Sequence, residues 1–308
     1  TELYEKAARE VSAKSENWMA FLRSACRNYR LPFDEQLLIH VQRPNAAAVL
    51  QMEDWNKKFG RWVKRDAKGI AVIDQKSNAM RLKYYFDISD TQEGKYKRLV
   101  RPVPLWEVNA AQKEAVRETL ANAFGVKTGG TELTETILEA AGNAAEDHVS
   151  DYLHDILNNR EDSFLEGLDA HSIEVETKKL LKNSIAYMLL VRCGIDPDAF
   201  LSADDFWNII NFNTLALINL FGAATSDVSE IALREDTVGR LSQEEKKKKR
   251  TFAGMEADRY NKKEQTETNA EGSLEYERDS IQQARRISPA QHHRARRTGT
   301  TPWEVRIP

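Results

Sequence analysis

Cysteines and long apolar runs are scarce in this sequence, and each shortage removes a class of protein from consideration. The 308 residues include only two cysteines, Cys26 and Cys193. Two cysteines so far apart are typical of buried free thiols in a reducing compartment rather than of a disulfide framework. No apolar run approaches the roughly 18–20 residues of a membrane span, and the first residues do not follow the basic-then-apolar order of a secretory signal. We therefore expect a cytoplasmic protein with no membrane partner.

Several motifs that carry enzyme chemistry do not occur either. No GxSxG or GxGxxG follows a predicted strand, and the sequence contains no HExxH helix and no CxxC pair. Gly129-Gly130 has neither the spacing nor the lysine of a phosphate-binding loop. We predict a protein that is not an enzyme and that has no catalytic residues, no metal and no cofactor.

Charged residues, in contrast, are abundant and unevenly distributed. They make up 30% of the chain, the formal net charge is -3 and the mean hydropathy is -0.61. The net charge is about +6 over residues 1–108, about -13 over 109–240 and about +4 over 241–308. A basic first region favours a polyanionic partner, and an acidic second region argues against nucleic acid there.

The basic region 1–108 begins with helical patterns. Apolar residues recur with helical spacing after Ser15, a candidate N-cap, and again between Asp34, which can cap a helix, and Pro44, which stops it. A further short helix is expected over residues 53–59 and should end at Gly60.

After Gly60 the spacing changes to that of strands. The runs 61–64 and 70–73 predict a hairpin that closes at Gly69, and 80–88 predicts a third strand. The prolines within 98–106 predict an extended exit from the domain. Residues 1–108 are therefore expected to form an α+β domain of helices and a small antiparallel sheet.

Residues 109–240 are expected to form an acidic, all-helical domain. Its candidate helices are Ala110–Phe124, Leu133–Asn158, Ser172–Cys193, Ala203–Asn211 and Asn213–Gly239, the last broken near Gly222. Its expected core residues are Tyr187, Leu189, Leu190, Phe206, Trp207, Ile209, Ile210, Phe212, Leu215, Leu217, Ile218 and Leu220. No period of 20–50 residues recurs, so a solenoid is not expected.

The last region, 241–308, is charged and polar and has no apolar periodicity. Such a segment cannot bury enough surface to offset its ordering entropy, so we predict a disordered linker or tail. Its abrupt end leads us to expect a fragment of a longer polypeptide with downstream domains.

Basic residues alternate with tryptophans between Gln42 and Gly69. Lysine and arginine neutralise phosphates, and aromatic faces stack on bases, so this pattern suits single-stranded nucleic acid. The alternative is that Trp55 and Trp62 are core residues and that the lysines only solubilise a hairpin.

Acids and histidines at helical spacing on 133–158 form a second candidate site. Asp147, Asp151 and Asp155 share one face, with His148 and His154 close by in sequence. Carboxylates and imidazoles at this spacing can hold a metal ion. A solvated acidic face explains the same residues.

Ser15–Asp74 resembles the N-terminal, single-stranded-DNA-binding domain of ArdC-type antirestriction proteins. The resemblance is carried by Trp18–Leu22, Gln36–Ile39, Gln42–Ala46, Trp55, Gly60–Lys64 and Lys68–Ile70. Residues 135–240 resemble the region that follows this domain in very large helicase or DNA-methyltransferase proteins of conjugative elements and phages of Gram-positive bacteria. The peptidase half of ArdC has no counterpart here.

The resemblance implies a non-catalytic, sequence-tolerant single-stranded-DNA-binding module of a mobile-element antirestriction or DNA-transfer protein. The residues expected to contact DNA are Gln36, Gln42, Arg43, Trp55, Lys57, Arg61, Trp62, Lys64, Arg65 and Lys68. The sequence departs from the ArdC-type pattern at two positions, where Glu35 stands in place of a common Asn and Asp66 in place of a common Gly. Each departure adds a carboxylate, which would weaken the attraction for phosphate. Two alternatives are an acidic helical domain that inhibits a host defence nuclease by DNA mimicry, and a scaffold for downstream catalytic domains.

Overall fold

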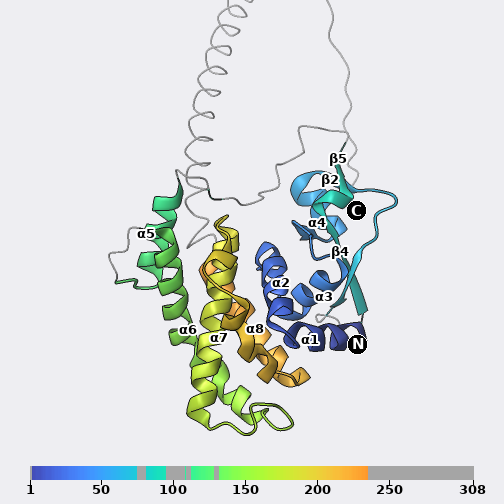
Figure 1. The fold of residues 1–308 in the computed structure, drawn as a ribbon. Coiled ribbons are helices and arrows are strands. Elements are labelled where there is room, and N and C mark those ends of the chain that lie inside the picture. The colour runs from blue at the N-terminus through green and yellow to red at the C-terminus, as the bar shows by residue number, and fades with distance from the viewer. Residues whose placement is uncertain (1, 75–80, 95–107, 109–111, 128–131, 235–308) are drawn as a thin grey trace, which may run out of the picture. The chain divides into compact units, whose positions relative to one another are not determined.

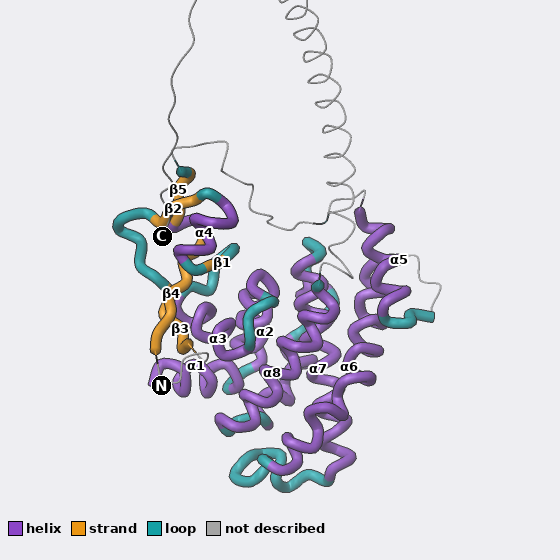
Figure 2. The backbone as a smooth tube through the Cα atoms, turned by 180° about the vertical axis from the view of Figure 1, so that it is seen from behind, coloured by secondary structure: helices purple, strands orange, loops and turns teal. Residues whose placement is uncertain are grey.

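Helices make up most of the described chain, and a small antiparallel sheet lies in its N-terminal part (Figure 1 and Figure 2). The structure, a computed structural model, describes residues 2–74, 81–94, 108, 112–127 and 132–234. The helices are α1 (Glu2–Ser12), α2 (Ser15–Ala25), η1 (Cys26–Asn28), α3 (Phe33–Gln42), α4 (Met52–Phe59), η2 (Ile88–Asp90), α5 (Lys113–Ala123), α6 (Leu133–Asn158), α7 (Ala170–Arg192), η5 (Pro197–Ala199), η6 (Ala203–Asn211) and α8 (Leu215–Leu233). The strands are β1 (Val49–Leu50), β2 (Arg61–Val63), β3 (Ile70–Asp74), β4 (Arg81–Asp87) and β5 (Thr91–Glu93).

The larger hydrophobic core joins the first helices to the last ones. The ring centroids of Trp18 in α2 and Phe221 in α8 are 5.4 Å apart. The Nε1 of Trp18 also donates a hydrogen bond to Ser184 Oγ of α7 at 2.9 Å. The expected boundary between residues 108 and 109 therefore does not separate two hydrophobic cores, because the apolar face of α2 is buried against α7 and α8. Both regions belong to one compact unit, Thr1–Glu244.

The strands pair differently from the expected hairpin. The run 61–64 does form β2 and the run 70–73 does form β3, but the two strands do not pair with each other. β2 pairs with β5, with Trp62 opposite Gln92, and β3 pairs with β4, with Ala71 opposite Tyr84. The hairpin prediction was wrong because the Lys64 N–H donates to the Asp90 carbonyl oxygen, which continues the β2–β5 pairing past Val63.

A smaller core lies between α3 and the three-stranded sheet, whose order is β1-β4-β3. Its residues are Leu38, Ile39, Ala46, Val49, Ile70, Val72 and Tyr85. Side chains of a strand alternate between the two faces of a sheet. One face of β3 and β4 is therefore buried on α3, and the other face is turned away from this core.

Several element boundaries also differ from the sequence prediction. The N-cap of α2 is Lys14 rather than Ser15, and α1 was not foreseen at all. α8 runs unbroken through Gly222, whereas Gly60 does end α4, with a left-handed φ of 64°. The expected extended exit over 98–106 and the tail over 241–308 lie outside the described residues.

Two sequence predictions about burial and membranes can also be compared with the structure. Cys26 and Cys193 are buried free thiols, as expected. Burial raises the pKa of the Cys26 thiol to about 11, so that it stays protonated. Within the described ranges, no helix combines the length and the apolar character needed to span a bilayer.

Candidate nucleic-acid interface

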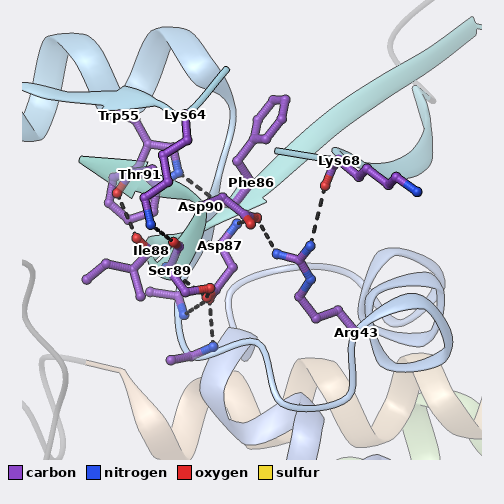
Figure 3. Close-up of polar contacts among 12 residues, drawn as sticks. Arg43, Trp55, Lys64, Lys68, Phe86, Asp87, Ile88, Ser89, Asp90 and Thr91 are labelled. Atoms are coloured by element: carbon purple, nitrogen blue, oxygen red, sulfur yellow. Dashed lines mark hydrogen bonds and ion pairs between the residues drawn. The ribbon is translucent and has the colours of Figure 1, made fainter. Parts of the chain in front are cut away.

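Three of the predicted basic residues contact the short segment Asp87–Thr91, called here the 87–91 segment, and two of them, Arg43 and Lys64, are drawn in Figure 3. Arg43, at the end of α3, forms an ion pair with Asp90 and also donates to the Lys68 carbonyl oxygen at 3.5 Å. Lys64 Nζ donates to the Ser89 carbonyl oxygen at 2.8 Å, and Arg61 donates from Nε to Thr91 Oγ1 at 2.7 Å. The 87–91 segment is thus in contact with the end of α3, with β2 and with the loop that follows β2.

Two carboxylates hold the 87–91 segment in position. The side chain of Asp87 accepts hydrogen bonds from the Ala47 and Ala48 N–H groups and from Ser89, and Asp90 accepts from the Asp87 N–H. Burial alone would raise the pKa of Asp87, but these hydrogen bonds outweigh it and hold the pKa below its ordinary value. Asp87 is therefore a structural anchor of the region.

Two predicted DNA contacts, Trp55 and Gln36, are buried and do not belong to the surface. Trp55 is fully buried, and its Nε1 donates to the Phe86 carbonyl oxygen at 2.8 Å. Gln36 donates to the Leu31 carbonyl oxygen at 2.6 Å and accepts from Ser226 Oγ of α8 at 3.1 Å. Both sequence predictions are corrected: these polar groups are satisfied inside the protein, and neither side chain can reach a ligand.

A third predicted contact, Gln42, is exposed but has its amide engaged with the protein. Its Nε2 donates to the Ala71 carbonyl oxygen at 2.8 Å, and its Oε1 accepts from the Ala71 N–H at 3.0 Å. The side chain thereby satisfies the free backbone edge of β3. Gln42 is better described as an edge-covering residue than as a base-reading one.

The remaining predicted residues form the exposed part of the site. Lys57, Arg65 and Lys68 are exposed, and their side chains have no hydrogen bond or ion pair within the described residues. Lys64 and Arg61 bond only neutral oxygen atoms there, so their charges are not neutralised by a carboxylate. These five cations can therefore attract phosphate groups.

Trp62 is the exposed aromatic residue among them, with 56% of its surface accessible. Its ring lies against Gly94, where an added Cβ would come within 2.9 Å of the indole Nε1. Gly94 therefore borders the Nε1 edge of the ring, and more than half of the side chain stays accessible to solvent. Of the two tryptophans that the sequence left open, Trp55 is a core residue and Trp62 is available for stacking.

The two added carboxylates behave differently. Glu35 is buried, and its carboxylate accepts from Lys83 Nζ at 2.5 Å and from Tyr85 Oη at 2.7 Å. Its charge is compensated inside the protein, so the expected weakening of phosphate attraction does not apply to Glu35. Asp66, in contrast, is exposed beside Arg65.

Sequence reasoning missed the outward face of β4. Leu82 and Tyr84 are exposed there, and Phe86 is half-buried. The alternation within 80–88 signalled this face, because every second residue of a half-buried strand must point away from the core.

The acids and histidines of α6 do not form a metal site. His148 Nδ1 lies 3.4 Å from Asp151, and His154 contacts Asn158. In the part of the chain that the structure describes, no three histidine, cysteine or acidic side chains are grouped closely enough to hold a metal ion.

Comparison of the chain with models of protein families, with curated proteins and with solved structures finds no match.

Proposed function

We propose that the region around β2 and the 87–91 segment is a sequence-tolerant, non-catalytic binding surface for single-stranded DNA. The observation that carries the proposal is a group of five cations in residues 57–68, which have no carboxylate partner among the described residues and share this stretch with the exposed ring of Trp62. They are Lys57, Arg61, Lys64, Arg65 and Lys68. The resemblance to ArdC-type antirestriction proteins points the same way, and the proposed role is the protection or transfer of mobile-element DNA.

The chemistry favours single strands over a duplex. The cations would neutralise successive phosphates, and the exposed ring of Trp62 would stack on an unpaired base. In a duplex the bases already stack on each other, so this ring would gain no partner. Because contacts to phosphates and to base faces do not depend on base identity, the binding would tolerate any sequence.

The experiment that tests the proposal is fluorescence anisotropy of labelled single- and double-stranded oligonucleotides over a series of salt concentrations. It requires the full 308-residue chain, because α2 shares a core with α7 and α8 and a cut near residue 130 would expose Trp18. We expect tighter binding of the single strand and a steep loss of affinity with salt.

The informative variant is the double substitution Arg65→Ala and Lys68→Ala, which removes two exposed cations that have no partner in the part of the chain that the structure describes. Each lost phosphate contact should lower the slope of log K against log salt by about 0.7, so the pair should lower it by roughly 1.4. The matched control is Lys179→Ala with Lys182→Ala on α7, which changes the net charge equally at two exposed positions. Equal losses in both variants, or no binding at low salt, would contradict the proposal.

One observation favours a second function, protein binding by the acidic part of the chain. Phe164 and Trp207 are exposed there by 63% and 50%, although Trp207 was expected in the core. η6 has three residues per turn, so Phe206, Ile209 and Phe212 share its buried side and Trp207 is turned outward. Exposed aromatic residues are enriched at protein interfaces.

A restriction endonuclease with its DNA substrate separates the two functions. If the acidic part blocks the nuclease, the chain inhibits cleavage, Phe164→Ala with Trp207→Ala relieves the inhibition, and Arg65→Ala with Lys68→Ala does not. If the chain binds only single-stranded DNA, it leaves the cleavage of the duplex substrate unchanged. No inhibition by the unaltered chain would exclude nuclease blocking.

A further inference from the structure

The outward face of β4 carries an uncovered aromatic ring. Tyr84 is 51% exposed, and its neighbours on the same face are Leu82 and Phe86, at i−2 and i+2. The residues between them face the other way: Lys83 and Tyr85 both bond the buried Glu35. Among the described residues, the hydroxyl group of Tyr84 has no hydrogen bond, so the strand sets the orientation of this side chain.

The residues next to Tyr84 on the neighbouring strand and in the loop before it are too small to cover its ring. Its cross-strand partner on β3 is Ala71, and the residue before β3 is Gly69. A Cβ added to Gly69 would meet Tyr84 Cβ and Cδ1 at 3.1 Å and Phe86 Cζ at 3.2 Å. The loop that ends at Gly69 can therefore lie close against both rings only because this position has no side chain.

The same loop carries two of the cations that have no partner among the described residues. Arg65 and Lys68 lie between β2 and Gly69, and Lys68 directly precedes the glycine that touches Tyr84. Figure 3 shows the Lys68 side chain directed away from Arg43, whose guanidinium bonds the Lys68 carbonyl oxygen. The loop that packs on the Tyr84 ring through Gly69 therefore also carries, one and four residues earlier, two cations without partners among the described residues.

The strand that carries the Tyr84 ring is held on both sides. β4 is the central strand of its sheet, paired with β1 on one side and β3 on the other. At Phe86 its backbone also accepts the Trp55 indole N–H, shown in Figure 3. A ring held by such a strand loses little conformational entropy when a flat partner stacks on it.

Charge complementarity identifies the partner. A flat ring beside unpaired cations matches a base joined to a phosphate backbone, since bases stack on aromatic side chains while lysine and arginine neutralise phosphates. A purely apolar partner would leave the cations unused.

We infer that Tyr84 is a base-stacking residue for single-stranded nucleic acid, at a position separate from Trp62 in the chain and backed by Gly69 and Ala71. This rests on the proposed DNA-binding function and adds a specific subsite to it. In this arrangement the phosphates of the nucleic-acid strand lie along Arg65 and Lys68, and one of its bases stacks on the Tyr84 ring. Phe86 borders this position, and Leu82 extends it.

The test uses the full chain and two labelled oligomers of equal length, oligo-dT and an abasic strand with the same phosphates and no bases. The variants are Tyr84→Leu, which keeps an apolar strand residue but removes the ring, and Tyr84→Phe, which keeps the ring. Phe164→Ala, at an exposed aromatic residue of the acidic part, is the control. Circular dichroism and urea unfolding verify that each variant is folded.

We expect Tyr84→Leu to weaken oligo-dT binding about tenfold without changing its salt dependence. Tyr84→Phe and Phe164→Ala should stay within about twofold of the unaltered chain, consistent with a stacking role of the ring alone. The abasic strand should bind more weakly than oligo-dT and should not distinguish Tyr84→Leu from the unaltered chain.

Equal oligo-dT affinity of Tyr84→Leu and the unaltered chain would overturn the inference and leave the DNA-binding function standing. If that variant instead changes the oligomeric state measured by light scattering, the face binds a second copy of the chain. Failure of both strands to bind at low salt would remove the DNA-binding function itself, and the inference with it.

Discussion

Gly222 of α8 lies directly against the ring of Phe33 of α3. A Cβ on Gly222 would come within 2.4 Å of the Phe33 ring carbons. That ring is itself buried and packs edge-on against Phe21 at 5.4 Å between centroids. The absence of a side chain at Gly222 therefore sets how closely α3 and α8 can approach each other. The glycine does not break α8.

This contact predicts that Gly222→Ala destabilises the protein although alanine is the better helix former. Alanine gains about 1 kcal/mol in helix propensity, while overpacking a core costs about 1–3 kcal/mol or more. We expect a net loss of about 1–2 kcal/mol in urea unfolding. Phe33→Leu should relieve the clash, so the double variant should be more stable than the sum of the two single effects. Additive losses would mean that Phe33 is not the obstacle.

The buried group of Glu35, Lys83 and Tyr85 yields the second prediction. Burial would lower the pKa of Lys83, but the hydrogen bond and the charge of Glu35 outweigh it and raise that pKa, and burial with the Glu35 hydrogen bond raises the pKa of Tyr85 to about 12. Glu35→Gln leaves the Lys83 ammonium without its counter-charge, and we expect a loss of about 2 kcal/mol in unfolding free energy.

The control for that prediction is Lys83→Met combined with Glu35→Gln. Replacing both partners removes the unpaired charge, so the double variant should recover part of the loss. DNA binding should be unchanged in both variants, because Glu35 faces the interior. A gain in DNA affinity on Glu35→Gln would instead mean that its charge reaches the surface.

The third prediction concerns the pH dependence of stability and rests on His40. Burial, followed by the nearby charge of Arg27, lowers the pKa of His40 below its ordinary value of 6.5. The unfolded chain then binds this proton more readily than the folded one, so stability is complete above about pH 6.5 and falls as the pH drops through the folded pKa. His40→Phe keeps the aromatic contact with Phe21 and removes the titration.

Urea unfolding from pH 7.5 to pH 5 measures this effect. The unaltered chain should lose stability over this range, and His40→Phe should lose less of it. Parallel curves for the two proteins would assign the acid sensitivity to other groups.

The sequence predicted the local elements well but not the long-range contacts. Helix Leu133–Asn158 was predicted to the residue, and Gly60 was identified as a helix end, because apolar spacing and end signals are local properties. The pairing of β2 with β5 and the bond from Trp18 to Ser184, 166 residues apart, depend on the whole fold. Local spacing carries no information about either.

In the candidate site, too, the features that depend on local sequence could be predicted, and those that depend on long-range contacts could not. The cationic stretch could be found from residue types, but the difference between Trp55 and Trp62 could not, because both lie among lysines and only the packing on Phe86 separates them. The aromatic face of β4 could have been inferred from alternation alone. Nothing local signalled that Asp90 would pair with Arg43.

The last prediction separates structural from binding cations at the 87–91 segment. Arg43→Ala leaves the Asp90 carboxylate without its ion pair, so we expect a loss of about 1–2 kcal/mol in unfolding free energy. Lys68→Ala removes an exposed side chain with no partner among the described residues and should change stability by less than about 0.5 kcal/mol. In DNA binding the order should reverse: Lys68→Ala lowers the salt dependence, whereas Arg43→Ala changes affinity only through the altered loop. If Arg43→Ala is as stable as the unaltered chain and loses DNA affinity like Lys68→Ala, then Arg43 exchanges Asp90 for phosphate and is itself a DNA contact.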